Sequence, residues 1–302
     1  QPIYKLVNNW FIRRRAVGFA IVSASANVGG MIAAPVISYL IFDFGWRPAA
    51  ALAGLAIIII AIPCALPLHG SPEMLGLTPD GKGRKEDKGP HPLRIATDVD
   101  FTVKEAVRTS AYWLLAGGIS MRLFVTVALS VHFVPILVWK GMDETTSAYL
   151  VSLFAFSAIF TALAMGWWGD RWNKVLISSL GVLPLAGALV WLGLSPSTAA
   201  LYILPVGFAV AMGTPALNWA LIGDFFGRHS YATLRGIMAL AYGIGTFFSP
   251  IYAGWIFDRT ESYTIVLFTF AAVLIVSSVL FFLLPHPSQL QEKKSSAPRN
   301  PG

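Results

Sequence analysis

The sequence predicts an all-α membrane protein with eight transmembrane helices, and three observations support this. Of its 302 residues, 56% are hydrophobic and only 12% are charged, whereas about a quarter of the residues in soluble domains are charged. The hydrophobic residues gather in eight runs, each near the ~20 residues that a bilayer-spanning helix needs. Lys and Arg concentrate in alternate gaps between these runs, as expected for a multi-pass topology.

The predicted spans cover residues 16–42, 48–68, 112–138, 146–168, 174–194, 199–222, 234–257 and 263–284. Most gaps are short, but residues 70–110 are rich in Gly, Pro and charge, which predicts a partly disordered linker. The string FTVKEAVRTSAYW at its end predicts a short amphipathic helix. We therefore divide the chain into the end of an N-terminal helical half (1–69), a linker (70–110), a six-helix C-terminal half (111–285) and a tail (286–302).

The distribution of basic residues predicts the orientation. Eight spans place both termini on one side, which carries eighteen of the 22 Lys and Arg, including those at the span ends, against three on the opposite side and one deep inside a span. Because cytoplasmic loops are enriched in Lys and Arg, the termini and the linker are predicted to be cytoplasmic. The net charge of +7 thus reflects topology, and we expect no nucleic-acid partner.

An internal repeat indicates two related halves. Both matching segments follow a basic turn and end in Phe-Asp, and the shared residues are separated by a constant 215 positions. They are Gly30, Pro35, Ile41, Phe42 and Asp43 in the first span and Gly245, Pro250, Ile256, Phe257 and Asp258 in the seventh. Since only two spans precede the linker, and the sequence starts with Gln1, we expect a chain truncated at its N-terminus by four spans.

The layout of six spans, a basic linker and six more spans resembles the major facilitator superfamily. GWWGDRWNK (Gly166–Lys174) resembles the cytoplasmic loop signature of that superfamily, and WFIRRR (Trp10–Arg15) resembles the entry to the fifth helix in monocarboxylate-porter-like members. PEMLGLTPDG (Pro72–Gly81) and HFVPIL (His132–Leu137) are similar to bacterial members of the monocarboxylate and oxalate–formate exchanger branch. The resemblance covers nearly the whole chain and implies a major facilitator-like helical bundle.

The resemblance implies a secondary active transporter in the bacterial inner membrane, which is the plasma membrane of such a cell. Its substrate would be a small organic anion such as a monocarboxylate, moved by alternating access with proton symport or anion exchange. The alternative is a non-transporting sensor or assembly partner with the same fold. The sequence holds no HExxH, GxSxG or GxxxxGK[ST] motif, so we expect no enzyme, catalytic residue, cofactor or metal. The expected partners are the anion and the lipid bilayer, and we expect a monomer.

Arg122 is the strongest candidate for a substrate-binding residue. It lies about 16 Å along the third span from Ala111, near the middle of a ~30 Å hydrocarbon layer. A guanidinium stays charged and presents a fork of donors that fits a carboxylate. We expect Arg122 to face a central cavity and bind the anion, with Thr126 and Ser130 on the same side. The alternative is a structural arginine that helix carbonyls or a neighbouring helix hold.

Other polar residues in the spans have two interpretations each. Asn27, Asn218 and Tyr242 either hydrogen-bond the substrate or join two helices. His132, near the outer end of its span, either couples proton movement to transport or is an interfacial histidine bonded to a backbone carbonyl.

The signature loop predicts a conformational gate. The resemblance implies that Asp170 and Arg171 latch the cytoplasmic face in one state, where Gly166 permits close helix approach. Asp224 and Arg235 line the next cytoplasmic turn and are assigned to the same gate. The alternative is a plain turn that only sets topology.

Overall fold

A computed structural model describes residues 2–81, 100–195 and 199–290 of the chain, and all regular structure in these ranges is helical. Eight helical segments in the described residues are long and apolar enough to cross a membrane. Every predicted span is confirmed, with each end within four residues of the helix boundary. The protein is a multi-pass, all-α membrane protein.

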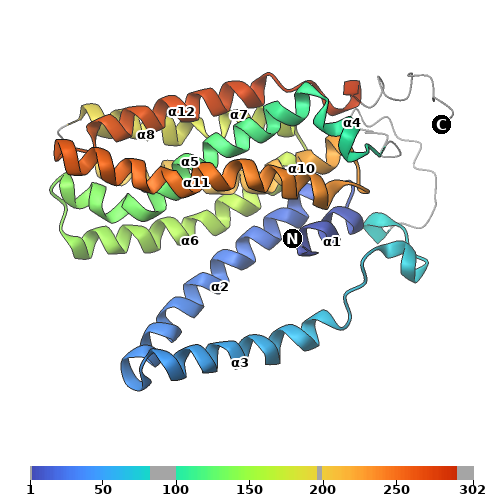
Figure 1. Ribbon diagram of the computed structural model, residues 1–302, viewed down its shortest axis with the longest axis horizontal. Coiled ribbons are helices and arrows are strands. Elements are labelled where there is room, and N and C mark those ends of the chain that lie inside the picture. The colour runs from blue at the N-terminus through green and yellow to red at the C-terminus, as the bar shows by residue number, and fades with distance from the viewer. Residues whose placement is uncertain (1, 82–99, 196–198, 291–302) are drawn as a thin grey trace.

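The first two spans form a V that diverges from the other six (Figure 1). They are α2 (Arg15–Phe44) and α3 (Trp46–Ala65), joined at Gly45, whose φ of +82° suits a residue without a β-carbon. Among the side chains of α2 that the structure describes, the buried ones lie in the first three turns, where Ala16, Phe19 and Ala20 join the hydrophobic core. A short helix, α1 (Pro2–Trp10), precedes them and was absent from the sequence-based prediction.

The other six spans form a compact bundle. Its helices are α5 (Ser110–Trp139), α6 (Glu144–Gly169), α7 (Lys174–Leu180) with α8 (Leu183–Leu194), α9 (Ala199–Gly213) with α10 (Pro215–Phe226), α11 (Tyr231–Thr260) and α12 (Thr264–Phe282). The most extensive packing joins α5 to α11 and α12, α6 to α2 and α9, and α8 to α9 and α12.

The fifth and sixth spans are each divided into two helices, whereas the sequence predicted continuous ones. Pro184 and Pro215 lie in the first turns of α8 and α10, where a missing N–H is tolerated. A β-carbon at Gly181 would lie 2.7 Å from Cγ2 of Thr214, so the two breaks are in contact. Broken helices inside a membrane are tolerated where protein buries them.

The linker is helical at both described ends, and residues 82–99, where disorder was predicted, lie outside the described residues. It contains the 3-10 helices η1 (Pro72–Leu75) and η2 (Pro79–Gly81), then α4 (Val103–Val107). The predicted amphipathic helix is confirmed as α4, which begins with a capping box between Thr102 and Glu105. With α1, these elements gather at one end of the bundle, here called the α1 end (Figure 1).

Carboxylates of the linker bind the turns at the α1 end. Asp80 accepts a hydrogen bond of 2.9 Å from the backbone N–H of Arg13, just before α2. Asp100 accepts one of 2.6 Å from the N–H of Arg228, between α10 and α11, and the Arg228 guanidinium pairs with Glu73 at 2.8 Å. The linker therefore contacts both parts of the molecule.

The repeat detected in the sequence coincides with a structural match. Helices α2 and α11 are both 30 residues long, and each contains one proline near the same position, Pro35 and Pro250. Shifting the bounds of α2 by 215 positions reproduces those of α11 to within one residue. The division of the chain into two halves with a linker at 70–110 remains a prediction.

Close backbone packing between α8 and α9 gives a direct test of the bundle. A β-carbon at Gly207 would lie 2.9 Å from the Pro184 carbonyl oxygen, whereas one at Gly187, on α8, would meet nothing within 4 Å. We expect Gly207→Leu to destabilise the protein by about 1–3 kcal/mol, because overpacking forces helices apart. Gly187→Leu should leave the thermal unfolding midpoint in detergent unchanged. Equal midpoints for the two variants would contradict this packing.

Candidate anion site and charge network

Arg122 lies in the interior of the bundle. Its side chain is 0% exposed and belongs to the buried stripe of α5, together with Leu115, Ile119, Thr126 and Leu129. These residues recur every three or four positions, so they share one face of the helix. The position is about 18 Å from the start of α5, at mid-depth of a ~30 Å layer.

Hydrogen bonds align α5 with the first broken span. The hydroxyl of Ser277 on α12 donates to the Gly118 carbonyl of α5 at 2.8 Å, and the hydroxyl of Ser179 on α7 donates to the Ser278 carbonyl at 2.9 Å. Gly118 is therefore level with the last turn of α7. Arg122 lies one turn further along α5, level with the break between α7 and α8.

Arg122 also lies at the boundary between two hydrophobic clusters. On α5, Leu115 and Ile119 belong to the cluster nearer the α1 end, and Val125 and Leu129 belong to the cluster beyond it. Buried polar residues occupy the corresponding level on the neighbouring helices, and they are Ser178, Ser179, Thr214, Ser277 and Ser278. The bundle thus contains a polar layer at its middle, with apolar packing on both sides.

Several groups in or next to this layer have no hydrogen-bond partner among the described residues. They include all three guanidinium nitrogens of Arg122, the hydroxyl of Ser178, and both polar side-chain atoms of Asn218. Ser178 is one turn before Gly181 and Asn218 one turn after Thr214, so both lie a turn from the contact between the breaks. A buried charge without a partner costs several kcal/mol. The layer therefore has the donors that an anion requires.

The other predicted binding residues occupy different environments. Thr126 is buried, and Ser130 is exposed and donates to the Thr126 carbonyl at 2.8 Å. Tyr242 is half-buried and packs with Trp219, their ring centroids 6.4 Å apart. Asn27 is half-buried on α2, among exposed residues in the arm of the V. The structure places Arg122, Thr126 and Asn218 inside the bundle and Asn27 outside it.

His132 joins three elements at the end opposite α1. Its Nε2 is 3.0 Å from the Pro250 carbonyl of α11, and its Nδ1 is 3.0 Å from the Tyr263 hydroxyl, just before α12. A carbonyl only accepts, so Nε2 donates to Pro250, whereas the tyrosine hydroxyl can either donate to Nδ1 or accept from it. Both ring nitrogens of His132 therefore have a hydrogen-bond partner.

The signature loop caps the start of α2. Asp170, at the end of α6, accepts hydrogen bonds of 2.9 Å and 3.0 Å from the backbone N–H groups of Ala16 and Val17. A carboxylate at this position also interacts favourably with the helix dipole. Burial raises the pKa of Asp170, and the ammonium of Lys174 and the two N–H groups act in the opposite direction. Gly166 lies against Ala16 and Ala20, so a β-carbon there would collide with α2.

Asp224 is the centre of a buried charge network. Its two oxygens pair with Nη1 of Arg15 at 2.6 Å and with Nζ of Lys174 at 2.7 Å. The side chains of Arg15 and Asp224 are 1% and 4% exposed. The network joins α2 to α10 and to α7, so it holds the first part of the chain to the bundle.

The other two predicted gate residues, Arg171 and Arg235, lie against aromatic rings. Arg171 is exposed and stacks on the Trp167 ring, its Cζ 3.8 Å from the ring centroid. Arg235 is buried, with its Cζ 3.6 Å from the centroid of Tyr4 and 4.2 Å from that of Trp219. Cation–π contacts of this kind stabilise a desolvated guanidinium.

Sequence reasoning missed the pairing of Arg15 and Lys174 with Asp224, since it placed them only in the strings Trp10–Arg15 and Gly166–Lys174 and among the basic residues that set topology. Their pairing with Asp224 spans 209 and 50 positions, so no local pattern predicts it. Gly223, beside Asp224, is a further part of the site, because a β-carbon there would meet the Arg15 guanidinium at 2.9 Å.

The chain belongs to the Major Facilitator Superfamily. The sequence model of that family matches residues 1–219 and residues 133–301, which together reach almost the whole chain. Membership, predicted from the layout of the spans and from the Gly166–Lys174 loop, is confirmed. The assignment to a bacterial branch remains a prediction.

The chain is also similar to vertebrate proteins named as monocarboxylate transporters. It is 26% identical to monocarboxylate transporter 12 of Rattus norvegicus over 305 residues, covering 93% of this chain and 62% of that protein. It is 23% identical to monocarboxylate transporter 12-B of Danio rerio, and the match covers 99% of this chain and 67% of that protein. It is 22% identical to monocarboxylate transporter 14 of Mus musculus, and the match covers 94% of this chain and 68% of that protein. The chain therefore spans 62% to 68% of the length of these relatives.

The charge network predicts that neutralising Asp224, at its centre, strongly lowers the stability of the protein. Asp224→Asn removes the carboxylate that Arg15 pairs with and leaves Lys174 with only Asp170, at 3.8 Å, so we expect a loss of about 3–5 kcal/mol in the free energy of unfolding. Replacing all three residues together, as Asp224→Leu, Arg15→Met and Lys174→Met, should recover most of this loss, because apolar replacements of buried ion pairs are nearly neutral.

The measurement is the thermal unfolding midpoint of each variant in detergent. Asp143→Asn is the matched control, since Asp143 caps α6 through the N–H of Thr146, and asparagine is as good a cap. A midpoint for Asp224→Asn equal to that of the control would show that the network contributes nothing to stability.

Proposed function

We propose that the protein is a secondary active transporter that moves a small organic anion, a monocarboxylate, by alternating access. The single observation that carries this proposal is the buried guanidinium of Arg122, which has no partner among the described residues. Membership of the superfamily and similarity to proteins named as monocarboxylate transporters support it. Proton symport or anion exchange would drive the movement.

A carboxylate is the ligand that suits this position best. Arg122 is permanently charged, and its fork of N–H donors can form two parallel hydrogen bonds with the two oxygens of a carboxylate. The side chain is enclosed by the bundle, so the helices have to move apart to admit a ligand, and a small substrate requires less movement than a large one. Substrates with one carboxylate and a small body fit this requirement.

The broken helices bring backbone dipoles to the same level. Helices α7 and α9 end, and α8 and α10 begin, at the contact between Gly181 and Thr214. The N-terminal and C-terminal ends of a helix carry opposite partial charges, so groups of both signs meet there. In secondary transporters, half-helix ends of this kind surround the substrate near the midplane. We propose that Asn218 and Thr126 contribute hydrogen bonds to the same site.

The network at the α1 end is proposed to act as the gate. Asp170 and Asp224 hold the start of α2 against α6 and α10 through contacts of 2.6–3.0 Å. Opening a path at this end requires these contacts to break, which suits a latch of one transport state. We further propose that this end is cytoplasmic and that the protein resides in the plasma membrane of a bacterium.

Arg122 is tested by uptake of radiolabelled lactate into vesicles that contain the protein. We expect Arg122→Met to weaken substrate binding by about tenfold to a hundredfold, because a hydrogen-bonded charge contributes ~1.5–3 kcal/mol. The same variant should not lower the thermal unfolding midpoint, since removing an unpaired buried charge is neutral or stabilising.

A structural role for Arg122 gives the opposite pattern. If helix carbonyls hold the guanidinium in place, Arg122→Met lowers the midpoint and uptake together. Arg259→Met is the matched control: it removes an exposed arginine that stacks on Trp255, and uptake should persist. Wild-type uptake by Arg122→Met would exclude the anion-site proposal.

His132 is tested by the dependence of uptake on a pH gradient. Because both ring nitrogens are hydrogen-bonded, to Pro250 and Tyr263, we propose that His132 joins α5 to α11 and α12. His132→Gln should therefore lower the unfolding midpoint by the equivalent of about 1–2 kcal/mol and keep the response to pH. Loss of that response with an unchanged midpoint would instead assign proton coupling to His132.

A further inference from the structure

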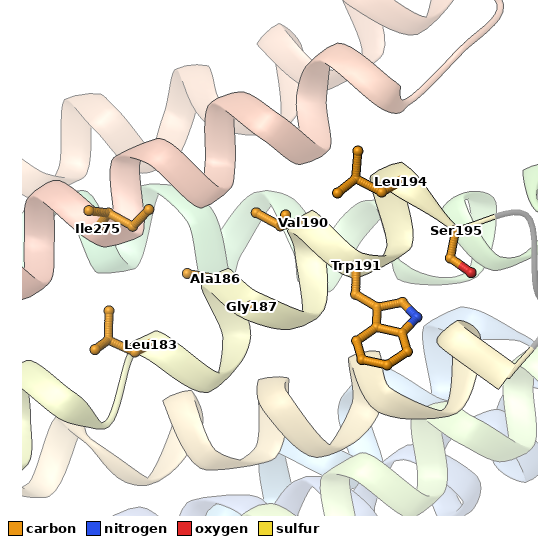
Figure 2. A pocket seen from close by; sticks show the side chains of 8 residues that line it. All are labelled: Leu183, Ala186, Gly187, Val190, Trp191, Leu194, Ser195 and Ile275. Carbon is orange, nitrogen blue, oxygen red and sulfur yellow. The ribbon is translucent and has the colours of Figure 1, made fainter.

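A groove on α8 is unrelated to the site around Arg122. It runs along α8 and is closed on one side by Ile275 of α12, and it has a volume of about 620 Å³ (Figure 2). Helix α8 packs against α9 and α12, whereas α2 packs against α6 and α10. The groove therefore lies on a part of the bundle that the first two spans do not cover.

Small side chains make the groove hollow. Gly187 lies one turn from Leu183 and one turn from Trp191, and Figure 2 shows the larger side chains on either side of it. A β-carbon at Gly187 would meet nothing within 4 Å. Trp191 and Leu194 are 56% and 71% exposed. In a multi-pass membrane protein, an exposed apolar face of this kind contacts the lipid chains.

The length of the groove matches the thickness of the hydrocarbon in one bilayer leaflet. From Leu183 to Ser195 the helix advances about 18 Å, at ~1.5 Å per residue. Leu183 lies near the middle of the span Lys174–Leu194, and Ser195 lies just beyond its end. One leaflet contributes about half of the ~30 Å hydrocarbon layer. The groove thus reaches from the midplane to the interface at the end opposite α1, as a single acyl chain does.

A cation lies at the interfacial end of the groove. Nζ of Lys140 donates to the Ser195 carbonyl at 3.1 Å and lies 5.1 Å from the centroid of the Trp139 ring. The acid nearest in sequence, Asp143, accepts from the N–H of Thr146 at the start of α6. Lysine and tryptophan side chains at this depth suit the headgroup region. An ammonium here can bind a phosphate.

We propose that this groove binds one phospholipid, with an acyl chain along α8 beside Ile275 and the phosphate on Lys140. Surrounding lipid chains are as apolar as the groove, so the hydrophobic effect does not favour this site over the bulk bilayer. Selectivity comes from dispersion contacts that fill the hollow and from the charge of Lys140. The proposal is independent of the transport function.

Native mass spectrometry of the detergent-purified chain, titrated with dioleoylphosphatidylglycerol, tests the site. We expect one tightly bound lipid per chain. Gly187→Leu, which fills the hollow, should remove it, and Lys140→Met should weaken it about fivefold. The matched controls are on α3: Gly54→Leu, also with open space around it, and Arg47→Met, an exposed basic residue. Both should retain the lipid.

Three results would overturn the proposal. The first is lipid binding that is unchanged in Gly187→Leu and Lys140→Met. The second is equal binding of dioleoylglycerol, which lacks the phosphate. The third is a dimer that Gly187→Leu abolishes, which would identify a second copy of the chain as the occupant of the groove.

Discussion

The absence of water in the bilayer is the constraint on which this structure depends. Every backbone N–H and C=O within the hydrocarbon must find a partner in the protein, which makes the spans helical and restricts where a helix can break. Both breaks obey this rule. The N–H of Gly181 donates to Ile177 at 2.8 Å, and the N–H groups of Leu217 and Asn218 donate to Thr214. The two irregular segments lie against each other, so each is buried by the other.

The same constraint distinguishes two buried charges. Asp224 lies at a helix end, where Arg15 and Lys174 approach it at 2.6 Å and 2.7 Å. Arg122 lies at mid-depth in the polar layer between the two hydrophobic clusters, without a hydrogen-bond partner in the described part of the chain. A paired ion is compatible with a structural role. An unpaired one needs a compensating group beyond the described residues, and an anionic ligand is the group that we propose.

The proposed gate and the proposed anion site are physically connected through the helices that carry them. Helix α10 begins at the break beside Thr214 and ends near Asp224, while α7 begins at Lys174 and ends at the other break. Each of these short helices thus has one end at the charge network and one end at the polar layer. A rigid shift of α7 or α10 would act on both places at once, which is the coupling that alternating access requires.

The sequence by itself determined the fold class and the positions of the spans. Twenty-residue apolar runs have few alternatives in a membrane, and the Gly166–Lys174 loop is a local string that needs no contact to be recognised. It also identified Arg122, because a charge in an apolar run is visible without coordinates.

Only the tertiary structure decided the environment of Arg122, since burial depends on how α5 packs against helices distant in sequence. The same holds for the pairing of Arg15 with Asp224 across 209 positions, for the bonds of His132, and for the place of Asn27 outside the bundle. The helical period determines which residues share one face of a helix, but long-range packing determines which residues that face contacts.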